Sequence, residues 1–207
     1  MNLILLGPPG AGKGTQAKLL ANKLQLKHIS TGDLLRRQIS LNTKIGLESD
    51  NLISQGQFVS DQLATTLLEN ELPKENFILD GYPRNINQVH ILENMNLKID
   101  KVICLEVSDK IIAQRMSGRK ICPACGAMYH DFYHPPIKKD ICDCCNNNLI
   151  QRKDDKLMTV YERLKIYHKL TEPIINFYSA KKLLLRVSAD NPINSITEFI
   201  INALANL

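Results

Sequence analysis

The stretch from residue 2 to residue 15, "NLILLGPPGAGKGT", determines how the rest of this chain is interpreted. A short apolar run at 2–6 ends in glycine and proline, and Gly7-x4-Gly12-Lys13 then leads into residues of helical period. Glycines let backbone N–H groups turn inward around phosphate oxygens, and a lysine at this position reaches the terminal phosphates. The order of strand, loop, lysine and helix therefore predicts a phosphate-binding loop rather than a glycine-rich turn without a ligand.

The residue after Lys13 is Gly14, and the first hydroxyl follows only at Thr15. A direct hydroxyl ligand for Mg²⁺ is therefore missing, which disfavours a GTPase or a motor ATPase, as does the lack of an Asn-Lys-x-Asp motif for guanine. We expect Mg²⁺ to be held by nucleotide phosphates and waters instead.

Further apolar runs follow the first, with helical periodicity between them. The expected strands are 2–6, 27–30, 76–80, 101–107 and 183–187. The expected helices are 13–24, 33–40, 61–70, 85–95, 110–117, 158–181 and 193–205, the last with Asn191 as the capping residue before Pro192. Strands that are apolar on both faces and alternate with helices predict an α/β fold, a five-stranded parallel sheet with helices on both faces.

Two segments break this alternation and are predicted to be lobes inserted into one core domain. The first, 30–59, is polar and helical; the second, 115–152, holds five cysteines, a Pro-Pro pair and aromatic residues. The core would then consist of 1–29, 60–114 and 153–207.

Length and composition set further bounds. The 207 residues, 44% hydrophobic and 23% charged, suffice for one substantial core with small lobes. The first apolar run is too short for an export signal or a membrane span, so we expect a cytoplasmic, reducing compartment and no membrane partner. The net charge of +5 is compatible with a polyanion site but too small to indicate nucleic acid.

The cysteines of the second lobe have the spacing of a structural zinc ribbon, Cys122-x2-Cys125-x16-Cys142-x2-Cys145. Cys145 rather than Cys144 reproduces the two-residue spacer of the first pair. Four thiolates complete a tetrahedral Zn²⁺ site, so the metal should be structural and not catalytic. The alternatives are free buried cysteines, or ligation by His130 and His134, which we expect to be hydrogen-bonded residues of the lobe.

Outside this lobe, Cys104 lies in an apolar run and is expected in the core. Gly126 and Asn146, which each follow a second cysteine, suit the left-handed backbone that such a turn needs.

The ribbon also raises a nucleic-acid hypothesis, which its charge disfavours. Residues 115–152 contain six basic and three acidic side chains. Four thiolates with Zn²⁺ reduce this excess to about +1 by formal charge, a weak attraction for DNA. We expect no nucleic-acid partner and interpret the metal as the element that keeps a small lobe folded.

Arginines recur beside lobe boundaries, in "STGDLLRR" (30–37), "DGYPRNINQ" (80–88), "AQRMSGRK" (113–120), "IQRKDD" (150–155) and "YERL" (161–164). Phosphoryl transfer requires mainly positioning and neutralisation of the charge on the transferred group, and guanidinium groups suit both tasks. Surface arginines are more often solvated charges, so it is the set beside a phosphate loop that is informative.

These segments carry a family resemblance. "GPPGAGKGT" (7–15), "STGDLLR" (30–36), "DGYPR" (80–84) with Gln88, "GRKICPACG" (118–126), and "QRKDD" (151–155) followed by Arg163 resemble the adenylate kinases in their long form with a zinc-bearing lid. The similarity extends over essentially the whole chain.

The resemblance implies a monomeric nucleoside monophosphate kinase of nucleotide biosynthesis that converts ATP and AMP reversibly to two ADP by direct transfer. Segment 30–59 would be the NMP-binding lobe, and 115–152 the lid. The implied ATP-binding residues are Gly10, Ala11, Gly12, Lys13, Gly14, Thr15, Arg115, Arg119, Met128, Tyr129 and Asn191. The implied AMP-binding residues are Thr31, Arg36, Val59, Gly81, Arg84, Gln88, Arg152 and Arg163.

By the same resemblance, the implied catalytic residues are Lys13, Arg84, Arg119, Arg152 and Arg163. Asp33 and Asp80 would orient hydrated Mg²⁺, and Asp154 and Asp155 would fix the arginines of the lid. The chain departs from the family where Ala189 replaces a glycine near the adenine pocket, and at "KLM" (156–158), where the family has an acidic pair.

Two rival functions stay open from the sequence. One is a kinase for UMP, CMP or GMP, against which Gln88 and Thr31 argue. The other is a nucleic-acid-stimulated ATPase with the ribbon gripping the strand.

Overall fold

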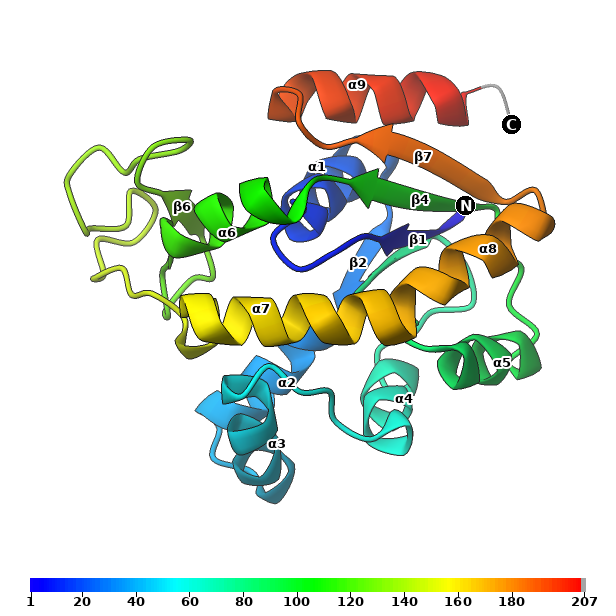
Figure 1. Ribbon diagram of the computed structural model, residues 1–207, viewed down its shortest axis with the longest axis horizontal. Helices are drawn as coiled ribbons and strands as arrows, with labels where there is room; N and C mark the ends of the chain where they lie inside the picture. Colours follow the sequence, from blue (N-terminus) through cyan, green and yellow to red (C-terminus); the bar gives the residue numbers. More distant parts are fainter. Residues whose placement is uncertain (206–207) are drawn as a thin grey trace.

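The computed structural model describes residues 1–205 and contains a five-stranded, all-parallel sheet in the order β2-β3-β1-β4-β7. Its strands are β1 (Asn2–Leu6), β2 (Lys27–Ser30), β3 (Phe77–Asp80), β4 (Lys101–Glu106) and β7 (Leu184–Ser188). The predicted α/β class and all five strands are confirmed, with ends that differ by at most one residue. Figure 1 shows the sheet between its helices.

The helices cover both faces of the sheet because alternate residues of each strand point to opposite sides. They are α1 (Lys13–Leu24), α2 (Thr31–Ser40), α3 (Lys44–Ser54), α4 (Asp61–Glu69), α5 (Ile86–Asn94), α6 (Asp109–Ser117), α7 (Leu157–Ile166), α8 (Glu172–Ala180) and α9 (Ile193–Leu204). Leu3 and Leu5 pack in one apolar cluster with α1 and α9. Ile4 and Leu6 pack in the other, with α4, α5 and α8.

The helix expected over 158–181 is present but is not α-helical throughout, because a π-helical segment, Tyr167–Thr171, separates α7 from α8. The helical periodicity persists through such a segment, so the sequence alone gave no sign of it. Asn191 does not cap α9: Pro192 holds the N-cap position, and no side chain there accepts a capping hydrogen bond.

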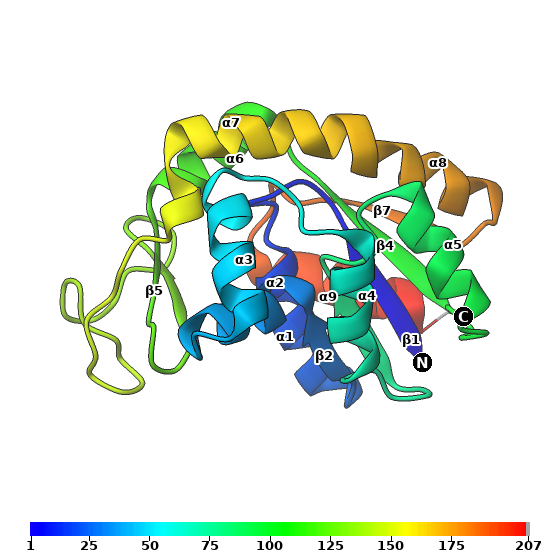
Figure 2. The same cartoon turned by 90° about the horizontal axis from the view of Figure 1, so that it is seen from below.

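Two lobes project from this core at the end where the parallel strands finish. The helices α2 and α3 pack together after β2, and a short antiparallel pair, β5 (Arg119–Ile121) and β6 (Met128–His130), lies beyond α6. Figure 2 shows α7 running from the side of β5 across the molecule toward α8, with α2 and α3 below it. The segments that follow β1, β2, β3 and β7 come together at this end, the usual position of a ligand site in a parallel sheet.

No helix among residues 1–205 has the length and apolar character needed to cross a membrane.

Candidate active site

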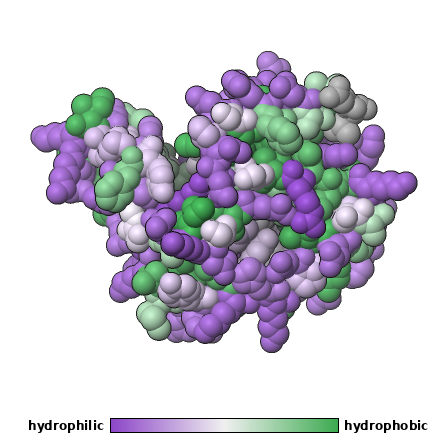
Figure 3. Space-filling model, turned by 45° about the horizontal axis from the view of Figure 1, so that its top comes forward, coloured by the Kyte–Doolittle hydropathy of each residue, from purple (hydrophilic) through white to green (hydrophobic). Residues whose placement is uncertain are grey.

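A cavity of about 1150 Å³ lies at the carboxyl edge of the sheet and is lined by residues from the core and both lobes. Figure 3 shows the second lobe, at the left, set off from the rest of the surface by a notch. Eight cationic side chains and three carboxylates line the cavity. This imbalance favours a polyanionic ligand over a neutral one.

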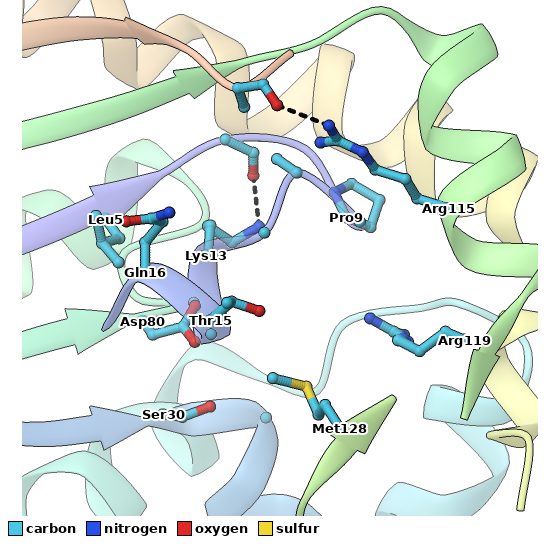
Figure 4. A pocket seen from close by; sticks show the side chains of 18 of the residues that line it. Leu5, Pro9, Lys13, Thr15, Gln16, Ser30, Asp80, Arg115, Arg119 and Met128 are labelled. Carbon is cyan, nitrogen blue, oxygen red and sulfur yellow. Dashed lines mark hydrogen bonds between the residues drawn. The ribbon is translucent and has the colours of Figure 1, made fainter. Parts of the chain in front are cut away.

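The phosphate loop forms one wall of this cavity. Gly12 has a φ of +96° at the start of α1, a backbone conformation that favours glycine. The Lys13 ammonium group donates to the carbonyl oxygens of Gly7 at 2.7 Å and Pro8 at 2.8 Å. Burial lowers the pKa of Lys13 to about 8, against the attraction of Asp80. Figure 4 shows Lys13 close to Asp80, with Arg119 and Met128 across the open space.

Arg84 and Arg152 face the cavity without an ion-pair partner among the described residues. Arg84 donates to the carbonyl of Gly81 at 2.7 Å, and its guanidinium carbon lies 4.8 Å from the centre of the Phe58 ring. The Nε of Arg152 is buried and has no hydrogen-bond partner. Burial lowers the pKa of both arginines, to about 10 and about 9. Half-buried charge without an ion-pair partner is destabilising, and a bound anion would relieve it.

Three other arginines of the cavity are paired with aspartates. Arg119 makes a two-point contact with Asp155, a carboxylate whose side chain is fully buried. Arg163 pairs with Asp154. The expectation that Asp154 and Asp155 fix arginines of the lid therefore applies to Asp155, whereas the partner of Asp154 lies on α7. Arg36 pairs with Asp33 at 2.6 Å.

The remaining residues expected to bind ATP also line this cavity. Arg115 donates to the carbonyl of Ala189 at 2.7 Å, the contact drawn at the top of Figure 4. The cavity wall includes the other expected ATP-binding residues, Gly10, Ala11, Gly14, Thr15, Met128, Tyr129 and Asn191. The structure thus brings all eleven together from four separate parts of the chain.

Of the residues expected to bind AMP, three lie behind the cavity wall. Arg36, Gly81, Arg84, Arg152 and Arg163 line the cavity, whereas Thr31, Val59 and Gln88 are buried next to it. The Thr31 hydroxyl donates to the carbonyl of Gly81 at 2.8 Å.

Both carboxylates expected near Mg²⁺ line the cavity. Asp80 ends β3, and a Cβ added at Gly14 would lie 3.3 Å from its Oδ2. The side chain of Asp33 is 53% exposed and already paired with Arg36, whose positive charge helps to lower the pKa of Asp33 even though burial opposes this. Of the two, Asp80 is therefore the carboxylate closer to the phosphate loop.

Sequence reasoning missed two residues. Phe58 lines the cavity beneath Arg84, and its position beside Val59 was the only signal. Asp61 accepts hydrogen bonds from both Asn85, at 2.7 Å, and Gln88, at 2.8 Å. From the sequence, Asp61 could be interpreted only as an acidic residue in the first turn of a helix, where such residues are common.

The four cysteines of the predicted ribbon converge in the second lobe. The sulfur atoms of Cys122, Cys125, Cys142 and Cys145 lie within 4.8 Å of one another. Tetrahedral Zn–S bonds of about 2.3 Å place sulfurs about 3.8 Å apart, so the donor set and its spacing fit zinc.

The backbone of the two cysteine turns is also the one expected. Gly126 and Asn146 have φ values of +72° and +59°. Each donates its N–H to the backbone carbonyl oxygen of the first cysteine in its turn, that of Cys122 at 3.0 Å and that of Cys142 at 2.9 Å. A structural four-cysteine zinc site is the coherent interpretation of this lobe.

The neighbouring candidates are outside the cluster. Cys144 is exposed and does not belong to it, as predicted from the spacer. His130 accepts from the backbone N–H groups of Phe132 and Tyr133 at 3.0 and 3.2 Å, and His134 stacks on Tyr129. Cys104 is buried in the core, and burial raises the pKa of its thiol to about 11.

A phosphate loop at the first strand of a parallel sheet, two lobes around a cationic cavity and a four-cysteine lobe define a nucleoside monophosphate kinase of the phosphate-loop class. The family model for adenylate kinase matches residues 5–183. The adenylate kinase of Clostridium beijerinckii is 42% identical over 214 residues, covering 100% of this chain and 99% of the relative. That of Caldicellulosiruptor bescii is 44% identical over 212 residues, covering 99% of each.

The chain belongs to the adenylate kinase family. Its activity is that of an ATP:AMP phosphotransferase, and its substrates are accordingly ATP, AMP and ADP.

Proposed function

We propose that this chain transfers the γ-phosphoryl group of ATP directly and in line to AMP, with no covalent intermediate and with individual residues in the roles that follow. The observation that carries the proposal is the set of cations that converge on one cavity, of which the half-buried Lys13, Arg84 and Arg152 have no ion-pair partner among residues 1–205. Preorganised charge of this kind stabilises the transferred group without reorganisation at the moment of reaction.

At the donor end, the backbone N–H groups from Gly10 to Thr15 and the ammonium group of Lys13 bind the ATP phosphates. Lys13 leaves its two carbonyl partners when phosphate oxygens offer a charged acceptor in their place. Arg119, positioned by Asp155, contacts the same phosphates. The adenine lies between Arg115 and the segment from Ala189 to Asn191, with Met128 and Tyr129 of the lid over it.

At the acceptor end, Arg36 and Arg84 bind the AMP phosphate, and Arg84 is kept in place by Gly81 and Phe58. Arg152 and Arg163 join them around the transferred phosphoryl group. Thr31, Val59 and Gln88 bind the nucleoside. Because these three are buried behind the wall, binding of AMP includes a local movement of the lobe that uncovers them.

Asp80 and Asp33 would hold hydrated Mg²⁺ beside the phosphate loop, and the ion would supply positive charge that offsets the negative charge of the nucleotide. This role is supported by Gly14, which lacks the hydroxyl group that would ligate the ion directly and lies beside Asp80.

The lobe boundaries that fit these roles are 30–59 for the NMP-binding lobe and 115–152 for the lid, with 1–29, 60–114 and 153–207 as the core. One Zn²⁺ per chain would stabilise the lid. Its cluster of buried hydrophobic residues contains only Cys122, Tyr129, Cys142 and Leu149, too little apolar surface to hold it folded.

We further propose that the protein acts as a monomer in the cytoplasm. A single chain supplies every wall of the cavity, and ATP and AMP are nucleotides of the cell interior. A solution mass of 23.4 kDa by light scattering would agree with this proposal, and twice that mass would contradict it.

The decisive experiment is a coupled assay of ADP formation from ATP with AMP, UMP, CMP and GMP in turn. AMP should be preferred strongly. Comparable efficiency with a pyrimidine monophosphate would contradict the acceptor assignment, and ATP hydrolysis stimulated by DNA or RNA without a monophosphate would favour the nucleic-acid alternative.

A further inference from the structure

The side-chain amide of Gln88 is held at both ends. Its Oε1 accepts the backbone N–H of Arg84 at 2.7 Å, and its Nε2 donates to Oδ1 of Asp61 at 2.8 Å. A backbone N–H can only donate and a carboxylate can only accept, so one orientation of the amide satisfies both partners. In the flipped orientation, Nε2 would face a donor and Oε1 would face a carboxylate.

Asp61 accepts hydrogen bonds from two side-chain amides, those of Gln88 and Asn85. The same Oδ1 accepts Nδ2 of Asn85 at 2.7 Å, and Oδ1 of Asn85 accepts the backbone N–H of Gln88 at 2.9 Å. The first turn of α4, which begins at Asp61, is thereby connected to the first turn of α5. Asp61 itself does not line the cavity.

The held amide keeps unused hydrogen-bonding capacity in a buried position. Gln88 is only 2% exposed, and the described residues supply one partner to Oε1 and one to Nε2. A second lone pair on Oε1 and a second N–H on Nε2 therefore remain. An unused acceptor and donor side by side, next to a ligand cavity, indicate a ligand edge with the complementary pattern.

Adenine and guanine present opposite patterns to such an amide. Adenine offers a donor at N6 and an acceptor at N1, which match the free acceptor and donor of Gln88. Guanine offers an acceptor at O6 and a donor at N1, so in the same pose it needs the flipped amide.

We propose that Asp61 is a positioning residue for acceptor specificity: by fixing the orientation of the Gln88 amide, it makes the site read adenine and reject guanine. The inference rests on the proposed role of Gln88 in binding the AMP base. Discrimination by a buried group that would be left mispaired is the strong form of hydrogen-bond specificity.

The test measures kcat/KM for AMP and for GMP in the full-length protein and in three variants. Asp61→Ala should lower the AMP-to-GMP ratio at least about tenfold, the order of one hydrogen bond. Asp61→Asn, which keeps the shape and one acceptor oxygen, should fall between this variant and the wild type. The matched control is Asp109→Ala, since Asp109 also opens a helix after a serine but does not contact Gln88. It should leave the ratio unchanged.

A double-mutant cycle with Gln88→Ala separates the two proposals. If Asp61 acts through Gln88, Asp61→Ala should not change the ratio further in a Gln88→Ala background. If Gln88→Ala lowers the AMP-to-GMP ratio but Asp61→Ala leaves it unchanged, the inference about Asp61 is overturned and the role of Gln88 stands. A ratio unaffected by Gln88→Ala would overturn both. If circular dichroism shows Asp61→Ala to be unfolded, Asp61→Asn decides, and an unchanged ratio in it counts against the proposal.

Discussion

In the sheet, β1 and β3 bury every residue, whereas the buried apolar cluster of the lid contains only Cys122, Tyr129, Cys142 and Leu149. The sheet is stabilised by apolar burial distributed over many side chains, so the loss of one leaves the rest in place. The stability of the lid depends mainly on one cluster of four cysteine sulfurs. Of the groups that we assign to the chemistry, Lys13, Arg84 and Arg163 lie on the core and Arg119 and Arg152 on the lid, whereas the proposed zinc site lies wholly on the lid. Stability and catalysis should therefore respond differently to changes in the two regions.

The largest effect should come from the core side of the cavity. Lys13→Ala and Arg84→Ala should each lower turnover by about 100-fold or more, because each removes preorganised charge from the transferred group. The fold should persist, since neither residue has an ion-pair partner in the described chain to leave uncompensated. The measurement is kcat in the coupled ADP assay. The matched control is Arg186→Ala, an exposed arginine paired with Glu106, which should stay within about twofold of the wild type.

The next effect concerns the lid and separates two adjacent cysteines. Cys145→Ser removes one thiolate from a closed site, so zinc content should fall well below one per chain and the lid should unfold at a lower temperature. Cys144→Ser, at an exposed position outside the cluster, should do neither. Metal analysis and thermal unfolding of both variants measure this. Loss of zinc in Cys144→Ser with retention in Cys145→Ser would reverse the assignment.

A third effect concerns the charge of Lys13, which should make the affinity for ATP depend on pH. The pKa of Lys13 is lowered to about 8 chiefly by burial, and ATP phosphates would raise it again. Below the lowered pKa the lysine is already protonated, so affinity should not depend on this group. Above it, binding must take up a proton, and affinity should fall by up to about tenfold per pH unit.

ATP binding measured between pH 7.5 and 9.5 should show this decrease in the wild type. Lys13→Arg keeps its charge over this range and should show a flatter profile. An affinity that is constant over the range in the wild type, or an equal decrease in both proteins, would contradict the assignment.

The smallest effect concerns the backbone of the first cysteine turn. Gly126 has a φ of +72°, and a Cβ added there would meet no atom within 4 Å. Gly126→Ala should therefore lower lid stability through backbone strain alone, by about 1 kcal/mol. Gly126→Asn should cost less, since Asn146 occupies the equivalent position in the second turn. Thermal unfolding of the zinc-loaded proteins measures both, and a larger loss with Asn than with Ala would contradict the strain argument.

The sequence predicts the core better than the contacts between its parts. Apolar runs and loop composition are local, and they located all five strands and the phosphate loop. The cysteine spacer likewise identified Cys145, because ligand spacing within a turn is local. The capping role expected of Asn191 was wrong, and the π-helical segment at Tyr167–Thr171 was not predicted, because tertiary packing decides both.

Pairings across the cavity were the hardest to predict. Arg119 and Asp155 are 36 residues apart, and Asp61 and Gln88 are 27 apart. Only the fold brings such groups together. The family resemblance had indicated Asp155 as a carboxylate that fixes arginines of the lid, whereas its particular partner, Arg119, and the contact of Asp61 with Gln88 could be found only in the structure.

The most direct test of the account compares two proteins in one assay at low temperature: zinc-depleted Cys145→Ser and zinc-replete Lys13→Ala. The quantity is the initial rate of ADP formation from ATP and AMP, with folding of each sample checked by circular dichroism. We predict measurable transfer in Cys145→Ser, because the metal takes no part in the chemistry, and a loss of about 100-fold or more in Lys13→Ala. A folded, zinc-depleted protein without activity would contradict the purely structural role of the metal, and a Lys13→Ala protein with near-normal activity would contradict the role of the phosphate loop in the chemistry.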